Sequence, residues 1–192
     1  MILSSKIGKA NKMTRLRFNI TPDWNIDDYK SLSFKRDTVK GQTTVQEYFR
    51  VGHKPGQMTM LNYFEPNPMP SSVDYVKTFF SDLVNVTAAI NVFEPGHYLP
   101  LHRDNYRKYQ SVAKDILKDR GIDAIYRYVV MLEDSVPGQM MHIGSTIHHS
   151  WTAGEVFGWA GDELHTFYNM SLKDRYAIQI TGIQKYKCKN YG

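Results

Sequence analysis

The sequence contains a single cysteine, Cys188, among its 192 residues. One cysteine cannot form a disulfide within the chain, so packed apolar side chains have to hold the fold together. The sequence also lacks an apolar run long enough to cross a membrane, and residues 1–13 lack the apolar stretch of a secretory signal. We therefore predict one soluble domain in the cytoplasm, without a membrane partner.

Acidic residues are absent from both ends of the chain. The basic side chains of the two termini are Lys6, Lys9, Lys12, Arg15, Arg17, Lys185, Lys187 and Lys189. Residues 18–184 hold 16 basic and 19 acidic side chains, so the net charge of +5 comes from the termini. Basic chain ends are usually solvated, and they are weak support for a nucleic-acid partner.

Internal repeats are also missing, and proline and glycine mark the loops. Residues 64–72, FEPNPMPSS, are too rich in proline for regular structure. Residues 71–83 then predict a helix with Ser71 or Ser72 as its N-cap. The predicted apolar face consists of Val73, Val76, Phe79, Phe80 and Leu83. We expect residues 1–86 to form N-terminal strands and this support helix, residues 87–184 the core, and residues 185–192 a basic tail.

The second half of the chain is rich in strand-forming residues. The predicted strands are residues 87–95, 124–134, 138–144, 152–160, 165–170 and 175–183. One amphipathic helix, residues 106–121, interrupts them and ends at Gly121. Short strands with glycine and proline turns indicate a β-sandwich or jelly roll. In the N-terminal part, residues 17–32 predict an edge strand with a turn, and residues 46–52 predict another strand.

A histidine and an aspartate lie two residues apart in the segment PLHRDNY. In an extended strand, His102 and Asp104 point to the same side and can reach one metal ion, whereas Arg103 points away. The chain has seven histidines, and an H-x-D match is expected by chance in about half of such sequences. The motif therefore needs a third ligand. Its alternative is a surface turn in which Asp104 caps the following helix.

The best third ligand is His165, at the start of a predicted strand in GDELHTFYN. Two imidazoles and one carboxylate on one side of an ion suit Fe(II) and leave positions open for a co-substrate and oxygen. Arg175 follows ten residues later. We predict a hairpin of the last two strands that returns Arg175 to His165, where its guanidinium can grip a carboxylate. Surface pairing with Asp162 or Asp174 is the alternative.

Residues 88–183 resemble the Fe(II)/2-oxoglutarate-dependent oxygenase superfamily, in particular its aspartyl/asparaginyl β-hydroxylase-like branch. The resemblance depends on the proline-glycine turn before His102, the W-x-x-G-E-V segment before His165, the H-x-x-x-N pattern, and the arginine ten residues after the histidine. It implies a mainly β fold with flanking helices, a double-stranded β-helix of the cupin-like jelly-roll kind. It also implies a hydroxylase with Fe(II) and 2-oxoglutarate as cofactors.

The resemblance also implies roles for single residues. His102, Asp104 and His165 would be the iron ligands, and Arg175 would anchor the C5 carboxylate of 2-oxoglutarate. Asn91 would assist at that carboxylate. Arg127 would meet the C1 carboxylate.

The chain departs from the branch at two positions. It has Asp104, which the best-known members lack, and it has Val129 where the branch often has a histidine.

Other conspicuous residues have less specific interpretations. Tyr106, His148 and His149 are candidate substrate contacts, although neighbouring strand residues face opposite sides and His148 and His149 cannot share one site. His142 is a rival ligand. The aromatic residues Trp151, Phe157, Trp159 and Phe167 are expected in the core. The helix over residues 106–121 packs on the core or acts as a lid or substrate-contacting element.

Three functions remain open at this point. The first is a dioxygenase that hydroxylates a protein side chain or a small molecule and releases succinate and CO2. The second is the same chemistry on nucleic acid, which the basic termini would bind. The third is a non-enzymatic cupin-like module that binds a metal or a ligand. The sequence does not predict the oligomeric state.

Overall fold

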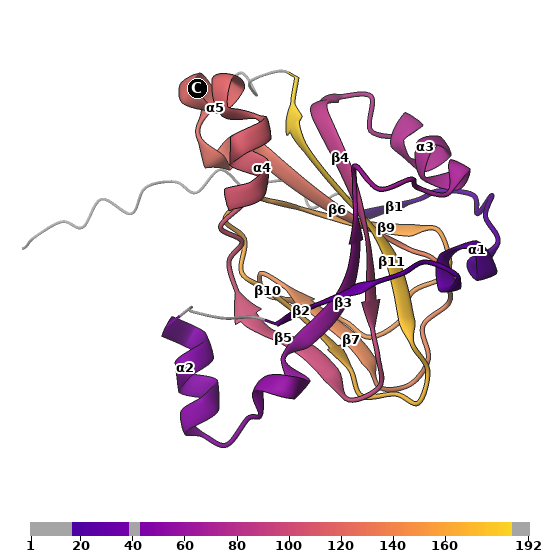
Figure 1. The fold of residues 1–192 in the computed structure, drawn as a ribbon, viewed down its shortest axis with the longest axis vertical. Helices are drawn as coiled ribbons and strands as arrows, with labels where there is room; N and C mark the ends of the chain where they lie inside the picture. Colours follow the sequence, from indigo (N-terminus) through magenta and orange to yellow (C-terminus); the bar gives the residue numbers. More distant parts are fainter. Residues whose placement is uncertain (1–16, 39–42, 186–192) are drawn as a thin grey trace, which may run out of the picture.

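The computed structural model describes residues 17–38 and 43–185 (Figure 1). The large antiparallel sheet has the order β1-β9-β6-β11-β4-β3-β2, and the small one has the order β5-β10-β7-β8. The strands are β1 Arg17–Asn19, β2 Lys35–Thr38, β3 Thr59–Phe64, β4 Leu83–Phe93, β5 His97–His102, β6 Ile125–Met131, β7 Gln139–Ile143, β8 Thr146–His148, β9 Glu155–Ala160, β10 His165–Asn169 and β11 Arg175–Gln184.

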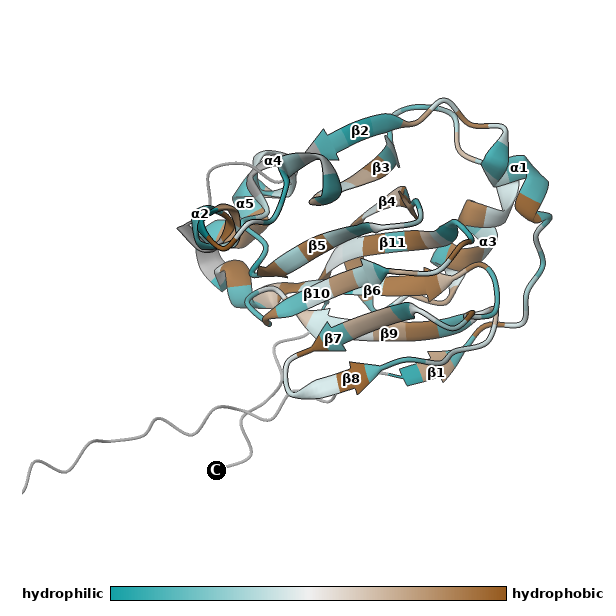
Figure 2. Ribbon diagram, turned by 90° about the horizontal axis from the view of Figure 1, so that it is seen from below, coloured by the Kyte–Doolittle hydropathy of each residue, from teal (hydrophilic) through white to brown (hydrophobic). Residues whose placement is uncertain are grey.

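Strands β4 to β11 form a double-stranded β-helix. Along the chain, β4, β6, β9 and β11 belong to the large sheet, and β5, β7, β8 and β10 belong to the small one. The chain therefore crosses repeatedly between two facing sheets, which is the winding of a jelly roll (Figure 2). The predicted fold class is confirmed. The N-terminal strands β1, β2 and β3 extend the large sheet at its two edges.

Helices lie on both sides of the barrel. Figure 1 shows α4 and α5 on the side opposite to α1 and α3, with α2 beside β5. Their bounds are α1 Ile26–Lys30, α2 Thr43–Arg50, α3 Ser71–Thr78, α4 Arg107–Val112 and α5 Lys114–Arg120, with 3-10 turns at Pro55–Gln57 and Ile122–Ala124. None of these helices of the described chain is long and apolar enough to cross a membrane.

Strand β11 shows how the sequence pattern builds two cores. Ile178 and Ile180 belong to the apolar cluster between the large sheet and the helices α1 and α3, and both are fully buried. Ala177, on the other face, packs between the two sheets. A fully buried isoleucine side chain contributes about 1.5–3 kcal/mol to folding. The same alternation turns Arg175 inward, where its guanidinium lies 4.8 Å from the ring centre of Phe167 on the small sheet.

Two predicted elements are wrong in type or length. Residues 46–52 were expected as a strand, but α2 occupies Thr43–Arg50. Its Val45 packs with Tyr98 of β5, so a tertiary contact overrides the strand preference of its aromatic residues. The helix predicted over residues 71–83 ends at Thr78, its N-cap is Pro70, and Phe79 is 42% exposed.

The helix predicted over residues 106–121 is broken in two. Helix α4 ends at Val112, and Ala113 has φ −105° and ψ 17°, outside the helical region, before α5 begins. Gly121 ends the second part at φ 73°, as predicted. Short strands β3 and β8 were not predicted. Most of the basic residues of the termini lie outside the described residues, as does Cys188.

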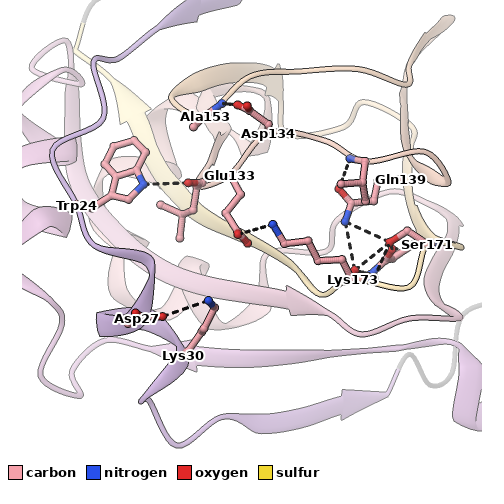
Figure 3. Close-up of polar contacts among 12 residues, drawn as sticks. Trp24, Asp27, Lys30, Glu133, Asp134, Gln139, Ala153, Ser171 and Lys173 are labelled. Atoms are coloured by element: carbon pink, nitrogen blue, oxygen red, sulfur yellow. Dashed lines mark hydrogen bonds and ion pairs between the residues drawn. The ribbon is translucent and has the colours of Figure 1, made fainter.

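One end of the barrel is closed by polar contacts between loops (Figure 3). Trp24 donates from its indole nitrogen to the carbonyl of Leu132 at 3.0 Å, and Lys173 pairs with Glu133 at 2.7 Å. Gln139 donates to Ser171 at 3.4 Å. These contacts tie the loop before α1, the loop after β6 and the loop after β10 together. Access to the interior is therefore expected at the opposite end, where β5 finishes and β10 begins.

The glycine of the W-x-x-G-E-V segment is Gly154, and its surroundings explain why no other residue fits there. It has φ +85°, and an added Cβ would lie 1.9 Å from the carbonyl oxygen of Ile20. The two residues are joined by a hydrogen bond from the Ile20 N–H to the Gly154 carbonyl at 2.8 Å. Only glycine permits this approach of the N-terminal segment to β9.

We predict that Gly154→Ala lowers the free energy of unfolding by at least about 2 kcal/mol, because the new methyl group collides with backbone. Gly56→Ala is the matched control, since nothing lies within 4 Å of its added Cβ. It should change the same quantity by less than about 0.5 kcal/mol in urea unfolding. Equal effects of the two substitutions would contradict this role of Gly154.

Candidate functional site

Strands β5 and β10 bring the two predicted histidine ligands together. They pair antiparallel with His165 opposite His102, and the ring centres of these residues lie 4.3 Å apart. Asp104 follows β5 directly. The Nε2 atom of His102 lies 3.8 Å from Asp104 Oδ1, and Nε2 of His165 lies 3.4 Å from Asp104 Oδ2. The structure therefore brings all three predicted ligands to one place, although they are far apart in the sequence.

Backbone carbonyls fix the orientation of both imidazoles. Nδ1 of His102 donates to the carbonyl of Pro100 at 2.7 Å, and Nδ1 of His165 donates to the carbonyl of Glu163 at 2.9 Å. A carbonyl can only accept, so each Nδ1 carries a proton and each Nε2 faces Asp104. A backbone carbonyl that accepts from the other ring nitrogen is typical of metal-ligating histidines.

The electrostatics keep Asp104 and His165 in the protonation states that a metal requires. Burial raises the pKa of Asp104, but Arg127 first and then the two imidazoles outweigh it, so its pKa lies below the usual range. Burial lowers the pKa of His165 to about 4, although Asp104 opposes this shift. At neutral pH the carboxyl is therefore an anion and His165 is neutral, as metal ligands must be.

The three residues fit a metal ion. Their ligand atoms all lie within 4.8 Å of one another. Ligands on one ion with bonds of about 2.1 Å are about 3.0–3.4 Å apart, so small side-chain movements suffice to bind it. Two imidazoles and one carboxylate, with the protein on one side, are a donor set for a divalent transition metal.

Arg175 is the most unusual side chain of the interior. It is only 4% exposed, and its Nε and Nη1 atoms have no hydrogen-bond partner in the described chain. The guanidinium is surrounded by aromatic rings, with Phe93 at 4.5 Å, Phe167 at 4.8 Å and Trp151 at 5.9 Å. Burial lowers its pKa to about 9, so it remains charged at neutral pH. A buried cation without an anion is costly and indicates a missing anionic ligand.

The alternatives for these residues are not observed. Asp162 lies 3.9 Å from Arg103, and the buried Arg175 forms no ion pair with Asp162 or Asp174 in the described chain. Asp104 does not cap the next helix, because the N-cap of α4 is Tyr106. The predicted hairpin of the last two strands is wrong. Strand β10 pairs with β5 and β7, whereas β11 pairs with β4 and β6, so Arg175 reaches the site across the barrel interior.

A cavity of about 40 Å³ connects Arg175 with the candidate metal ligands. Its lining residues are Met60, Asn91, Phe93, Leu99, His102, Asp104, Arg127, Val129, Trp159, His165, Phe167, Arg175 and Gln179. Asn91 and Arg127, the two other predicted cofactor contacts, are thus on its wall. Asn91 donates to Asn62 at 2.6 Å. Arg127 donates to Asp104 at 2.6 Å, a contact that the sequence did not predict.

The predicted substrate contacts lie in different places. Tyr106 is buried, and the guanidinium of Arg127 stacks over its ring at 4.7 Å. The ring of His148 lies 4.7 Å from that of Phe157. His149 is exposed. Neither of these histidines lines the cavity with the candidate ligands. The rival ligand His142 lies on the outward-facing side of β7, between the buried residues Met141 and Ile143.

Sequence reasoning missed three contributors to the site. Trp159 packs its ring 4.9 Å from that of His165, and Asn62 orients Asn91. Gln179 shares a strand face with Arg175. The period-two pattern of the last strand could have identified Gln179. The contacts of Trp159 and Asn62 depend on the sheet register, which the sequence does not contain.

Comparison with known proteins identifies no family. No protein-family model and no curated protein matches the chain. Similar solved structures include a Pseudomonas putida prolyl-4-hydroxylase, with 11% identity over 83% of this chain and 97% of that chain, at a TM-score of 0.48. They also include a Thermotoga maritima protein described as a predicted oxalate decarboxylase, with 11% identity over 80% and 95% of the two chains, at a TM-score of 0.43.

A third similar structure is the cupin domain of Cnp3 from Schizosaccharomyces pombe, with 8% identity over 65% of each chain and a TM-score of 0.40. Likenesses this distant carry no information about what this chain binds or catalyses. The oxygenase branch named from the sequence therefore stays a prediction.

We predict that Mn(II) stabilises the protein through the three candidate ligands. At 100 times its dissociation constant, a metal that binds only the folded chain adds about 2.7 kcal/mol to the free energy of unfolding. The melting temperature should rise with Mn(II) in the wild type and in His149→Ala, which removes an exposed histidine. It should not rise in Asp104→Asn or His165→Ala. Stabilisation of equal size in all four proteins would place the metal elsewhere.

Proposed function

We propose that the protein is an Fe(II)- and 2-oxoglutarate-dependent dioxygenase that hydroxylates a protein side chain or a small molecule. The observation that carries this proposal is the unpaired guanidinium of Arg175, buried in the same cavity as His102, Asp104 and His165. A metal-binding module needs the three ligands alone. A buried cation at the far end of the cavity supports a co-substrate that chelates the metal with one end and carries an anion at the other.

The donor set supports Fe(II) as the metal. Two histidines and one aspartate would hold Fe(II) from one side, which suits a metal that also binds a co-substrate and oxygen. When bound, Fe(II) and 2-oxoglutarate supply the oxidative chemistry, in which one atom of O2 enters succinate as CO2 is released and the other enters the substrate as a hydroxyl group.

The protein's own residues bind and orient the co-substrate. Arg175 has two buried donors without a partner in the described chain, Nε and Nη1, and one edge of its guanidinium can hold the C5 carboxylate with two parallel hydrogen bonds. The aromatic rings around Arg175 exclude water, which strengthens the ion pair. Arg127 has one donor on Asp104, and its Nε atom is buried without a partner. Because Arg127 lines the cavity of the candidate ligands, this free donor supports a contact with the C1 carboxylate in addition to Asp104.

The hydrogen bond from Arg127 also orients Asp104. Its Oδ2 atom accepts the hydrogen bond from Arg127, which holds the carboxylate against the two imidazoles. Arg127 therefore acts as a positioning residue for the ligand set. Trp159 fills the space beside His165 and restricts its ring to one orientation.

The experiment is an anaerobic titration with Fe(II) and then 2-oxoglutarate, followed by visible absorption. We predict a weak charge-transfer band that requires both components and disappears in His165→Ala. Arg175→Met should retain metal-induced stabilisation but weaken 2-oxoglutarate binding at least about 30-fold, because it removes the charged partner of a buried carboxylate.

A folded, iron-loaded protein without this band would contradict the dioxygenase proposal and support a cupin-like binding module. Unchanged 2-oxoglutarate affinity in Arg175→Met would remove the observation on which the proposal rests.

A further inference from the structure

A second and larger cavity of about 570 Å³ adjoins the candidate metal site. Met60, Asn91, Asp104, Arg127 and Gln179 line both cavities. The residues that line the larger cavity include members of β4, β3 and β2 of the large sheet. Figure 2 shows that this part of the large sheet continues beyond β5. A molecule bound there would lie beside Asp104. The volume is in the range of small-molecule and short-chain binding sites.

The wall of this cavity on β4 and β11 carries three polar side chains that form no hydrogen bond within the described chain. Thr87 and Thr181 lie directly opposite each other on β4 and β11, and Gln179 is two residues from Thr181. Among the described residues, no side-chain hydrogen bond involves any of the three. Thr181 is only 3% exposed, and Thr87 and Gln179 are half-buried. Polar groups without a partner inside the protein favour a ligand with its own donors and acceptors.

Most of the charged side chains that line the cavity form ion pairs within the described chain, but one does not. Arg127 donates to Asp104 at 2.6 Å, and Glu65 pairs with Lys77 and accepts from the Ala88 N–H at 2.8 Å. Asp37 on β2 is exposed at the rim of the cavity and has no cation within ion-pair distance in the described chain. Its only side-chain contact there is a long hydrogen bond of 3.5 Å from Asn62. The wall farthest from the metal site therefore offers one unpaired negative charge.

The sheet order sets the length of a ligand that uses both ends. Strand β2, with Asp37, is four strands from β6, with Arg127. At about 4.8 Å between neighbouring strands, the two backbones are roughly 19 Å apart. The side chains shorten this span, so a ligand that contacts both Asp37 and the Arg127–Asp104 pair has to be elongated. An extended chain with polar groups along its length can make both contacts.

We propose that the larger cavity binds the substrate and that this substrate is an extended chain with a basic group, a guanidinium or an amine, that pairs with Asp37. The proposal rests on the dioxygenase function for the reaction, but the binding site itself does not require the metal. Thr87, Gln179 and Thr181 contact the polar middle of the chain. The bond to be oxidised lies at the Asp104 end.

If Asp37 had only a structural role, its substitution would have a different effect. Asp37 accepts from Asn62, and Asn62 accepts from Asn91, so the carboxylate also orients two amides. Loss of that role would change stability or 2-oxoglutarate binding. It would not change the preference of the cavity for a cationic over a neutral ligand of the same shape.

The test uses Nα-acetyl-L-arginine methylamide and its neutral counterpart Nα-acetyl-L-citrulline methylamide, titrated by NMR into the apo protein and into protein with Zn(II) and 2-oxoglutarate. We expect the arginine probe to bind at least fivefold more tightly in the wild type. Asp37→Asn should reduce this ratio to about one without changing the affinity for the citrulline probe. Asp74→Asn, at an exposed position on α3, should leave the ratio unchanged.

Thr181→Val provides the second variant, because it keeps the shape and removes the hydroxyl. It should weaken both probes equally. The proposal is overturned if the preference persists in Asp37→Asn, if the wild type binds both probes equally, or if neither probe binds at 10 mM. A preference that depends on Asp37 in protein that binds no metal would contradict the dioxygenase function alone. Metal and 2-oxoglutarate binding without the preference would contradict the cavity proposal alone.

Discussion

The antiparallel pairing of β5 with β10 is the constraint on which the site depends. It sets His165 opposite His102 and places both Nε2 atoms toward the carboxylate that follows β5. The carbonyls of Pro100 and Glu163 then fix both rings. A shift of one residue in this pairing would turn one of the histidines to the outer face of the small sheet. The metal site is thus a consequence of strand register as much as of residue type.

The two ends of the barrel differ in structure. One end is closed by contacts such as that between Trp24 and the Leu132 carbonyl, and it buries Arg175 among aromatic rings. The other end carries the candidate metal ligands and adjoins the larger cavity. A co-substrate anchored at Arg175 would therefore lie deep in the barrel, while the substrate approaches from the side of β4 and β3. Under the proposed function, this separation would let one scaffold hold co-substrate and substrate in a fixed arrangement.

The sequence predicted the jelly roll because strand patterns are local features, and the short spacings of His102 with Asp104 and of His165 with Arg175 are local as well. That these two segments meet was implied by the family resemblance. The sequence could not predict which strands pair. For this reason the last two strands were expected as a hairpin, although they belong to different sheets. Helix α2 was missed because the packing of Val45 on Tyr98 is a tertiary contact. The contact of Arg127 with Asp104 depends on the same unknown register.

The most direct test of the account is a crystal structure of the protein with Mn(II) and 2-oxoglutarate. The account predicts that His102, Asp104 and His165 bind the metal and that the C5 carboxylate lies within hydrogen-bond distance of the Arg175 guanidinium. A metal bound to other residues, or a 2-oxoglutarate that leaves Arg175 unpaired, would contradict it.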